Sequence, residues 1–551
     1  MLLIECSKIK KYFIDRLVLD IDSLKIYSED KIGIIGANGV GKTTLLNILS
    51  KRLEPDEGRV ELFSSYSYIS QLEDAVNKSI GGEIASKLGV SNTWNDSMSG
   101  GEKTRFKLAE SLSKKSAMLL ADEPTSNLDI EGIEIMEKML EEYKGALIII
   151  SHDRNLLDKV CNKILEIEDG KIKIYSGNYS DYVVQKKQER DRAQVEYDKY
   201  VKEKKRLKEV VDNTTKKVRS IKKAPKRMGN SEARLHKMGG QKAKANLERA
   251  VKNIEKRIEH LDKKEKPKEP ISIKLDLMET EKLHSKIIIE GTKLNKVFDE
   301  KIILKDAEFI IYNGSKVALI GPNGCGKSTL IKMIIERDVN IKIAKGVKIG
   351  YFSQDMNILK EDLSIIENVM ESSIYPETFA RNLLARLLFK REMVYKKVRV
   401  LSGGEKVKVS FAKILLQDFN LLILDEPTNY LDINSFEVIE EALREYDRTL
   451  LFISHDRSFI DAVADHIMTI EDHKTKMFLG NYKEYLNMLN KFLDNKNKEE
   501  IEKKIFILEN RMSEIIGKLS MPSKNDDVEL LDREYHEILQ ELKELKTKLN
   551  N

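Results

Sequence analysis

Two stretches of the sequence have the glycine and lysine spacing of a phosphate-binding loop. Each follows a short apolar segment typical of a strand and precedes an apolar segment typical of a helix. Glycines in such a loop let backbone N–H groups close on phosphate oxygens, and the lysine reaches the outer phosphates. The residues expected to bind ATP in this way are Gly36, Asn38, Gly39, Gly41, Lys42, Thr43 and Thr44 in the first loop and Gly321, Asn323, Gly324, Gly326, Lys327, Ser328 and Thr329 in the second.

A pair of carboxylates ends a later apolar strand in each half of the chain. We expect Glu123 and Glu426, the second member of each pair, to polarise the attacking water. An isolated acidic pair after a strand is often only a helix cap, but the phosphate loops upstream favour the catalytic interpretation. The side chains expected to hold Mg²⁺ are Asp122 with Thr43 and Asp425 with Ser328.

The elements that position these residues belong to a duplicated α/β domain. Short apolar runs such as 31–35 and 146–150 alternate with helical patterns, which predicts a mainly parallel sheet. The two loop lysines are 285 residues apart, whereas Glu123 and Glu426 are 303 apart. Near-constant offsets indicate a tandem repeat. Gln71 and Gln354 are 283 residues apart, so the jump from 283 to 303 places an extra 20 residues in the second copy, between Gln354 and Ser402.

Two further tetrapeptides make the resemblance specific. Ser99-Gly-Gly-Glu and Ser402-Gly-Gly-Glu resemble the signature motif of the ATP-binding cassette superfamily. The resemblance implies ATP contacts from Ser99, Gly100, Gly101, Ser402, Gly403 and Gly404, Q-loop glutamines at Gln71 and Gln354 that also approach the metal, and catalytic switch histidines at His152 and His455. It also places Tyr12 and Phe298 where an aromatic ring stacks on adenine, although a role in the core would suit these two residues nearly as well.

The segment between the copies is strongly basic. From 183 to 270 it holds 29 Lys and Arg against 14 Asp and Glu, a net charge of +15, while the whole chain is only +5. A helix without Pro or Gly is predicted from Tyr182 to about Asn213, and a second from about Ser231 to Leu261, which together form an antiparallel hairpin. A charge run is usually a solvated helix face. In this segment the cations are concentrated near the turn, while the rest of the chain is net acidic. That distribution instead favours a phosphate-rich partner.

The domain organisation expected from these patterns has four parts. They are a first nucleotide-binding domain (1–182), a helical linker (183–285, with its tip at about 211–229), a second nucleotide-binding domain (286–487) and a C-terminal helical hairpin (488–551). The C-terminal hairpin is predicted from helical patterns at 499–519 and 528–549, and packing or dimerisation suits it as well as a binding role.

Composition narrows the setting. The sequence has no apolar run long enough to cross a bilayer and no export signal at its start, so no membrane association is expected. Three scattered cysteines give neither a disulfide framework nor a zinc site, which favours a reducing cytoplasm.

Taken together, two copies in one chain, the signatures and the basic linker resemble ATP-binding cassette family F, the ribosome-associated factors. The segment from Lys223 to Lys237 is similar to the linker of the antibiotic-resistance, Vga-like branch. The resemblance implies a monomer that closes its two cassettes head to tail over two ATP molecules. It also implies that the linker tip is aimed at large-subunit rRNA and tRNA near the peptidyl-transferase centre. The tip residues expected to contact RNA are Lys216, Lys217, Arg219, Lys222, Lys223, Lys226 and Arg227.

The functional expectation is therefore an ATPase that protects the ribosome against lincosamides, pleuromutilins and group A streptogramins. A housekeeping translation factor shares nearly every motif and remains an alternative. An exporter subunit would need a membrane partner. A DNA-maintenance ATPase would divide one ATPase into two incomplete halves, whereas both halves here are complete.

Overall fold

The structure is a computed structural model of the 551-residue chain. It describes residues 1–70, 75, 77–114, 116–220, 230–267, 283–298, 301–353, 358–389, 391–427, 431–520 and 528–550. The chain separates into two compact units. Unit 1 comprises Met1–Ser126, Glu134–Ile273 and Asp432–Asn434, and unit 2 comprises Asn127–Ile133, Lys274–Leu431 and Ser435–Asn551.

Unit 1 is built around a six-stranded sheet in the order β5-β6-β7-β3-β8-β9. Its strands are β3 (Lys31–Ile35), β5 (Tyr66–Ile69), β6 (Met118–Asp122), β7 (Ala146–Ile150), β8 (Lys163–Glu168) and β9 (Lys171–Ser176). All neighbours pair in parallel except β8 and β9. Every residue of β6 and β7 is buried, as expected for central parallel strands covered on both faces.

A second, antiparallel sheet of unit 1 has the order β2-β1-β4, with β1 (Leu2–Phe13), β2 (Arg16–Tyr27) and β4 (Glu57–Leu62). The helices of this copy are α1 (Lys42–Leu49), α2 (Gly82–Lys87), α3 (Gly100–Ser113), α4 (Ile130–Glu142) and α5 (Arg154–Val160). A continuous core joins both sheets to α1, with Ile4, Leu46 and Ile148 among its buried members.

Unit 2 repeats this architecture. Its six-stranded sheet runs β14-β15-β16-β12-β17-β18, and its antiparallel sheet runs β11-β10-β13. The strands are β10 (Ile287–Phe298), β11 (Lys301–Tyr312), β12 (Lys316–Ile320), β13 (Ile341–Ile343), β14 (Ile349–Phe352), β15 (Leu421–Asp425), β16 (Thr449–Ile453), β17 (His466–Glu471) and β18 (Lys474–Leu479). The equivalent helices are α8 (Lys327–Ile335), α11 (Gly403–Leu415), α12 (Ile433–Glu445) and α13 (Arg457–Val463). The predicted duplicated α/β fold is confirmed.

The extra residues of the second copy fold as additional helices before its signature. Short α9 (Ile365–Met370) corresponds to α2 and is followed by α10 (Glu377–Arg386) and the 3₁₀ helices η1 (Arg391–Tyr395) and η2 (Val398–Val400). In the inserted α10, Ala380 and Leu384 are fully buried. The insertion is therefore a packed part of unit 2.

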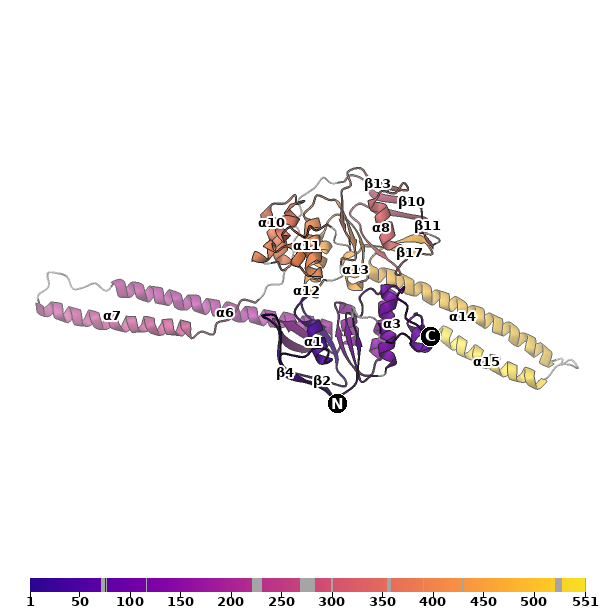
Figure 1. The fold of residues 1–551 in the computed structure, drawn as a ribbon, viewed down its shortest axis with the longest axis horizontal. Coiled ribbons are helices and arrows are strands. Elements are labelled where there is room, and N and C mark those ends of the chain that lie inside the picture. The colour runs from indigo at the N-terminus through magenta and orange to yellow at the C-terminus, as the bar shows by residue number, and fades with distance from the viewer. Residues whose placement is uncertain are drawn as a thin grey trace. The chain divides into compact units, whose positions relative to one another are not determined.

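The linker forms the predicted antiparallel hairpin in unit 1, between α6 (Tyr179–Ser220) and α7 (Asn230–Glu259) (Figure 1). Ion pairs join Glu203 to Arg257 at 3.6 Å and Glu196 to Lys264 at 3.2 Å. Glu196 precedes Glu203 in α6, whereas its partner Lys264 follows Arg257 in the chain. The two segments therefore run in opposite directions. At about 1.5 Å per residue, the 42 residues of α6 span about 63 Å.

Both long helices that leave a cassette sheet start earlier than predicted. Helix α6 begins at Tyr179 because Asn178 caps it by accepting from the N–H of Asp181 at 3.0 Å. In unit 2, α14 (Tyr482–Ser520) begins at Tyr482 behind an equivalent cap, in which Asn481 accepts from the N–H of Glu484 at 2.9 Å. The Asn-x-x-Asp/Glu spacing was the available signal. Helix α14 packs on α15 (Val528–Asn550) through Ile505, Ile515, Ile538 and Leu542.

Candidate functional site

The phosphate loop of the first copy connects β3 to α1. Its lysine points back into the loop, where Lys42 Nζ donates to the carbonyl oxygens of Gly36 at 2.8 Å and Ala37 at 3.3 Å. Gly41 precedes the helix with φ 106°, a left-handed conformation that glycine adopts without strain. A cation therefore lies within a ring of backbone groups at a helix N-terminus, which is the electrostatic setting of a phosphate site.

The loop of the second copy has the same geometry. Lys327 Nζ donates to Gly321 O at 2.8 Å and to Pro322 O at 3.0 Å. A Cβ atom at Gly326 would lie 2.4 Å from Ile303, whereas one at Gly324 would meet no atom within 4 Å. The glycine that faces the helix is thus required by packing, and the one at the tip borders open space. This arrangement fits a phosphate group in front of the loop.

Each copy also brings a hydroxyl to a carboxylate beside its loop. Ser328 Oγ donates to Asp425 Oδ1 at 3.4 Å, and Thr43 bonds to Asp122 in the first copy. Burial raises the pKa of Asp122, and the Thr43 hydroxyl and the Lys42 charge oppose that rise. Within the described residues, no three His, Cys, Asp or Glu form a ligand group. One carboxylate and one hydroxyl suit Mg²⁺, which takes its remaining ligands from phosphate and water.

A glutamate and a histidine lie side by side next to each loop. His152 Nε2 is 3.2 Å from Glu123 Oε1, and His455 Nε2 is 3.3 Å from Glu426 Oε1. Neither contact is aligned as a hydrogen bond, so the two Oε1 atoms and the Nδ1 atom of each histidine lack hydrogen-bond partners in the described part of the chain. Buried polar atoms without partners mark a place where a further group binds.

Burial controls the charge of these pairs. It raises the pKa of Glu123 and of Glu426 to about 8, and it lowers the pKa of His152 to about 3 and of His455 to about 4. Each histidine is therefore neutral at neutral pH, with one ring nitrogen free to accept and the other to donate. Such a group can orient a water or a phosphate oxygen beside the glutamate without adding charge.

The backbone at both glutamates is left-handed, with φ 48° at Glu123 and φ 51° at Glu426. Sequence reasoning missed this feature because no residue type signals it: glutamate rarely adopts such a conformation. Strain of about 1–3 kcal/mol at a non-glycine residue is typical of functional sites. Its recurrence in both copies places the carboxylate by backbone geometry as well as by side-chain packing.

The two signature motifs start helices α3 and α11 through capping boxes. Ser99 Oγ accepts from the N–H of Glu102, while the Glu102 carboxylate accepts from the N–H of Ser99 at 2.8 Å and from its hydroxyl at 2.7 Å. Ser402 and Glu405 repeat the arrangement. The hydroxyl of Ser99, followed by its backbone N–H, lowers the pKa of Glu102. Capping thus explains the shape that the motif has in both copies, while the N–H groups of the following glycines remain available to an anion.

The remaining predicted residues are distributed as follows. Tyr12 is the residue before the end of β1, and Phe298 is the last residue of β10. Their exposed fractions of 38% and 52% are inconsistent with a core role and leave both rings accessible. Thr44 and Thr329 lie in the first turns of α1 and α8. Lys216, Lys217 and Arg219 lie at the end of α6. Gln71, Gln354, Lys222, Lys223, Lys226 and Arg227 lie outside the described residues.

A carboxylate fixes the linker helix to the first copy. Glu166 on β8 accepts from Tyr182 Oη at 2.9 Å and from Lys186 Nζ at 2.6 Å, both on α6. Strand β8 also borders the phosphate loop, because a Cβ at Gly36 would lie 2.7 Å from Ile167 O. The strand that limits the loop therefore holds the root of the helix. Tyr182 and Lys186 are 16 and 20 residues from Glu166 in the sequence. No local sequence pattern predicted this contact.

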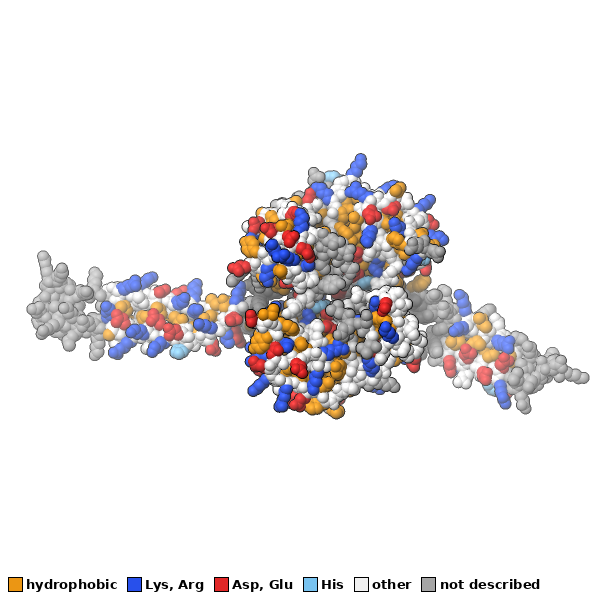
Figure 2. Space-filling model, viewed as in Figure 1, with side chains coloured by type: hydrophobic (Ala, Val, Ile, Leu, Met, Phe, Trp, Pro, Cys, Tyr) orange, Lys and Arg blue, Asp and Glu red, His pale blue; other side chains and the backbone are white. Residues whose placement is uncertain are grey.

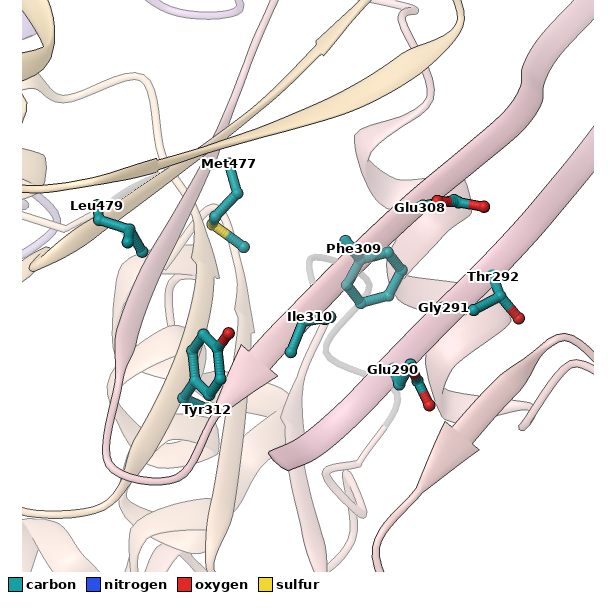
Figure 3. A pocket seen from close by; sticks show the side chains of 9 residues that line it. All are labelled: Glu290, Gly291, Thr292, Glu308, Phe309, Ile310, Tyr312, Met477 and Leu479. Atoms are coloured by element: carbon teal, nitrogen blue, oxygen red, sulfur yellow. The ribbon is translucent and has the colours of Figure 1, made fainter. Parts of the chain in front are cut away.

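One hollow of unit 2 lies away from these residues. It has a volume of about 400 Å³ and is formed by strands β10, β11 and β18 (Figure 3). Its walls are mostly apolar, with two carboxylates, and are made by Glu290, Gly291, Thr292, Glu308, Phe309, Ile310, Tyr312, Met477 and Leu479. No predicted nucleotide-binding residue lines it, so we assign the candidate site to the loops and not to this hollow.

Among the described residues, none of the helices combines the length and apolar character needed to cross a bilayer.

Comparison with known proteins places the chain in a family. The model of the ABC transporter domain matches residues 19–84, 68–126 and 304–429, and a second ABC transporter model matches 165–239. The chain is 35% identical over 470 residues to the erythromycin resistance ATP-binding protein MsrA of Staphylococcus epidermidis, covering 84% of this chain and 96% of that protein. It is 30% identical over 548 residues to the ribosome protection protein VmlR of Bacillus subtilis, covering 96% of each.

Solved structures share the fold. A structure described as RNase-L Inhibitor aligns with a TM-score of 0.60 at 18% identity, covering 89% of this chain and 93% of that one.

ABC transporter F family member 5 of Arabidopsis thaliana is 29% identical over 571 residues, covering 90% of this chain and 78% of that protein. With two ATP-binding cassettes, matched signatures and full-length relatives of this kind, the chain belongs to ATP-binding cassette family F, whose cassettes bind ATP and whose members are ATPases.

Proposed function

We propose that this protein binds the ribosome in an ATP-dependent manner and directs the tip of its linker toward the peptidyl-transferase centre, where it protects the ribosome from antibiotics. The observation that carries the proposal is the α6–α7 hairpin. Its first helix, α6, is about 63 Å long, and the root of α6 is fixed to the strand beside a phosphate loop. Two relatives that align over nearly their full length are described as a resistance protein and as a ribosome protection protein.

The chemistry proposed for each cassette uses the residues described above. Lys42 and Lys327 move from the loop carbonyls to the ATP phosphates. Mg²⁺ supplies charge neutralisation of the phosphates when bound, with Thr43, Asp122, Ser328 and Asp425 as its protein contacts and Gln71 and Gln354 near it. Glu123 and Glu426 accept a hydrogen bond from the attacking water, and the neutral His152 and His455 orient that water beside the terminal phosphate.

Closure of the cassettes is proposed to connect this chemistry to the linker. The signature of one cassette would complete the ATP site of the other, so that Ser402 and Gly403 face the first loop and Ser99 and Gly100 face the second. The helix N-terminus behind each capped serine offers N–H groups to the outer phosphate. Hydrolysis would remove that phosphate and release the clamp.

The target is proposed from the charge of the hairpin. Its end carries Lys216, Lys217 and Arg219 on α6, continued in the sequence by Lys222, Lys223, Lys226 and Arg227. Basic helices bind RNA through its phosphates and its shape, which suits large-subunit rRNA and tRNA. The drugs proposed to be displaced are lincosamides, pleuromutilins and group A streptogramins.

Sedimentation with ribosomes tests the binding step. The Glu123→Gln/Glu426→Gln variant, which keeps both ATP sites but lacks the carboxylates that act on water, should co-sediment with ribosomes in ATP and not without it. The Lys42→Ala/Lys327→Ala variant is the matched control and should remain in the supernatant in both conditions. If the glutamine variant binds ATP yet never sediments with ribosomes, the ribosome assignment is wrong.

Drug susceptibility tests the protective step. In a strain that depends on this gene for resistance, deletion of 211–229 should restore sensitivity to the three drug classes, while the protein still sediments with ribosomes. Erythromycin belongs in the same panel because it appears in the name of one relative. Unchanged resistance after the deletion would contradict the role of the tip. A growth defect without drug, and no change with drug, would instead identify a housekeeping translation factor.

A further inference from the structure

The segment just before the second signature differs in charge from its counterpart in the first copy. The eight residues before Ser402 include three cations and no carboxylate, whereas the eight before Ser99 include Asp96 and no cation. The three cations are Lys396, Lys397 and Arg399, and all three are exposed. None of them forms an ion pair within the described part of the chain. Figure 2 shows Lys and Arg side chains over the part of unit 2 that contains α10.

Backbone hydrogen bonds hold this segment in place. The N–H of Ile365 donates to Lys396 O at 3.0 Å, and the N–H of Val398 donates to Leu363 O at 3.1 Å. The side chain of Val398 is fully buried beneath it. The cations therefore project from a fixed edge, and binding a ligand would not require this backbone to become ordered first.

The first copy has the same frame without the charge. A single β-bridge joins Ser79 to Thr93 there, as one joins Ser364 to Lys397 in the second copy. The bond from the N–H of Trp94 to Lys78 O repeats the one made by Val398. Because the backbone is shared and the side chains are not, maintaining the fold does not account for the three cations.

An aromatic ring lies at the end of the same edge. Tyr395 is 59% exposed, and the Arg381 guanidinium lies 5.1 Å from its ring centre and donates to its hydroxyl at 2.6 Å. Glu377 accepts from the Nε of the same guanidinium at 2.7 Å and lies 2.6 Å from its Nη2. A tyrosine fixed in this way and largely open to solvent is a stacking surface for a planar ring, at little cost in side-chain entropy.

Several carboxylates near this segment are bonded to other groups: Glu361 pairs with Lys406 at 3.0 Å, Glu377 with Arg381, and Glu405 with the N–H and hydroxyl of Ser402. The N–H and hydroxyl of Ser364 lower the pKa of Glu367, and the charge of Lys397 contributes to that shift. In the described part of the chain none of the three cations lies within ion-pair distance of a carboxylate, so the positive charge of the segment faces solvent.

We propose that residues 395–399, with Arg381, form a second RNA-binding surface, which takes an unpaired nucleotide on Tyr395 and its flanking phosphates on Lys396, Lys397 and Arg399. An exposed aromatic ring beside three cations suits single-stranded RNA better than an acidic protein, because stacking adds to the charge attraction. The surface lies directly before the signature serine, so RNA binding here would also restrain the segment that leads into α11. The proposal extends the proposed function, from which it takes the ribosome as the source of the RNA.

Fluorescence anisotropy of the full-length protein with a labelled, unstructured RNA 12-mer tests the surface. In the Lys396→Gln/Lys397→Gln/Arg399→Gln variant, the slope of log affinity against log salt should fall by about 2, as expected for three lost phosphate contacts. Tyr395→Ala should weaken binding about tenfold without changing the slope. The charge-matched control is Lys305→Gln/Lys342→Gln/Lys345→Gln in the same unit, which should change neither. Neutralising Lys216, Lys217 and Arg219 on the linker should add to these effects independently.

Two results would overturn the proposal. One is a neutralised variant that binds RNA like the control variant. The other is binding of labelled polyglutamate that the neutralised variant loses while its RNA binding is unchanged, which would indicate an acidic protein partner. Its failure is separable from failure of the proposed function. If the neutralised variant carrying Glu123→Gln and Glu426→Gln still sediments fully with ribosomes in ATP and protects the same rRNA positions, this surface is wrong and ribosome binding stands. If the RNA effects appear but ribosomes are never bound, the RNA-binding surface stands and the proposed ribosome binding is wrong.

Discussion

The backbone N–H of Glu123 donates to the carbonyl oxygen of Ile150, the last residue of β7, at 2.9 Å, and this bond secures a left-handed glutamate at the end of β6. The second copy repeats it between Glu426 and Ile453 at 3.1 Å. A residue that costs energy to hold in place has been retained at the same point of both sheets. The position of the carboxylate is thus set by pairing between β-strands before any nucleotide is bound.

Glycine should be tolerated better than alanine at these two positions. Relief of the left-handed strain should make Glu426→Gly more stable than Glu426→Ala by about 1 kcal/mol, and the same order should hold at Glu123. Urea midpoints with unchanged slopes measure the difference. At Glu134, an exposed position in α4, the order should be reversed, because glycine there only adds flexibility to a helix. The same order at all three positions would contradict a strained glutamate.

The Cys325 thiol should report occupancy of the second phosphate loop. It is partly exposed, whereas Cys6 and Cys161 are buried, so maleimide at pH 7.5 should modify one cysteine per chain. Burial raises the pKa of the Cys325 thiol, which makes the reaction slow but measurable. ATP should protect it, because the thiol lies between the loop glycines. Intact mass after timed labelling gives the rate.

The matched control is Cys325→Val, since Val40 occupies the equivalent position and contacts Gly36 as Cys325 contacts Gly321. This variant should bind ATP normally and take up no maleimide. Labelling of Cys6 or Cys161 in the native protein, or equal rates with and without ATP, would show that the loop does not shield residue 325.

The two buried thiols should weaken unit 1 in alkaline solution. Burial raises the pKa of Cys6 and of Cys161 to about 12, while an unfolded thiol titrates near 8.5. Their contribution to stability is therefore complete below about pH 8.5 and is lost as the pH rises toward 12, by at most about 1.4 kcal/mol per pH unit for each thiol. Urea midpoints of Cys6→Ala/Cys161→Ala should fall less steeply than those of the parent between pH 8.5 and 10.5. Parallel curves would show that the thiols titrate alike in the folded and unfolded states, so that burial does not raise their pKa.

Sequence reasoning predicted the fold from information that is local. The loops, the strand-end carboxylates and the signatures are short motifs, and the expected α/β duplication followed from their offsets. It was less successful at helix ends: α6 continues to Ser220 and α14 runs unbroken through 490–498, although Asn-rich segments favour a break. Once a helix is nucleated, adding a residue costs little, so weak formers are carried along. The left-handed glutamates and the Glu166 contact depend on pairing between distant strands and helices, which no local pattern records.

The last prediction concerns that Glu166 contact, because the two copies offer a natural comparison. Glu166, Tyr182 and Lys186 of the first copy correspond to Thr469, Tyr485 and Leu489 of the second at the common offset of 303 residues. The polar clamp is therefore specific to the helix that carries the linker. Glu166 and Lys186 are only 14% and 19% exposed, so their hydrogen bonds are poorly replaced by water.

The Glu166→Thr substitution copies the residue of the second copy and should release the root of α6. Loss of a buried, charge-assisted clamp should destabilise unit 1 by about 1.5–3 kcal/mol and speed amide hydrogen exchange in the first turns of α6. The stability of Glu166→Gln should lie between that of the parent protein and that of Glu166→Thr, since glutamine can still accept a hydrogen bond from Tyr182. Basal ATP hydrolysis should be unchanged in both variants, because Glu166 contacts the helix and not the loop. If this root aims the linker, the effect of ribosomes on ATP hydrolysis should decrease in the variants whose α6 amides lose protection from exchange. Variants that loosen α6 without altering the effect of ribosomes would show that the clamp serves stability alone.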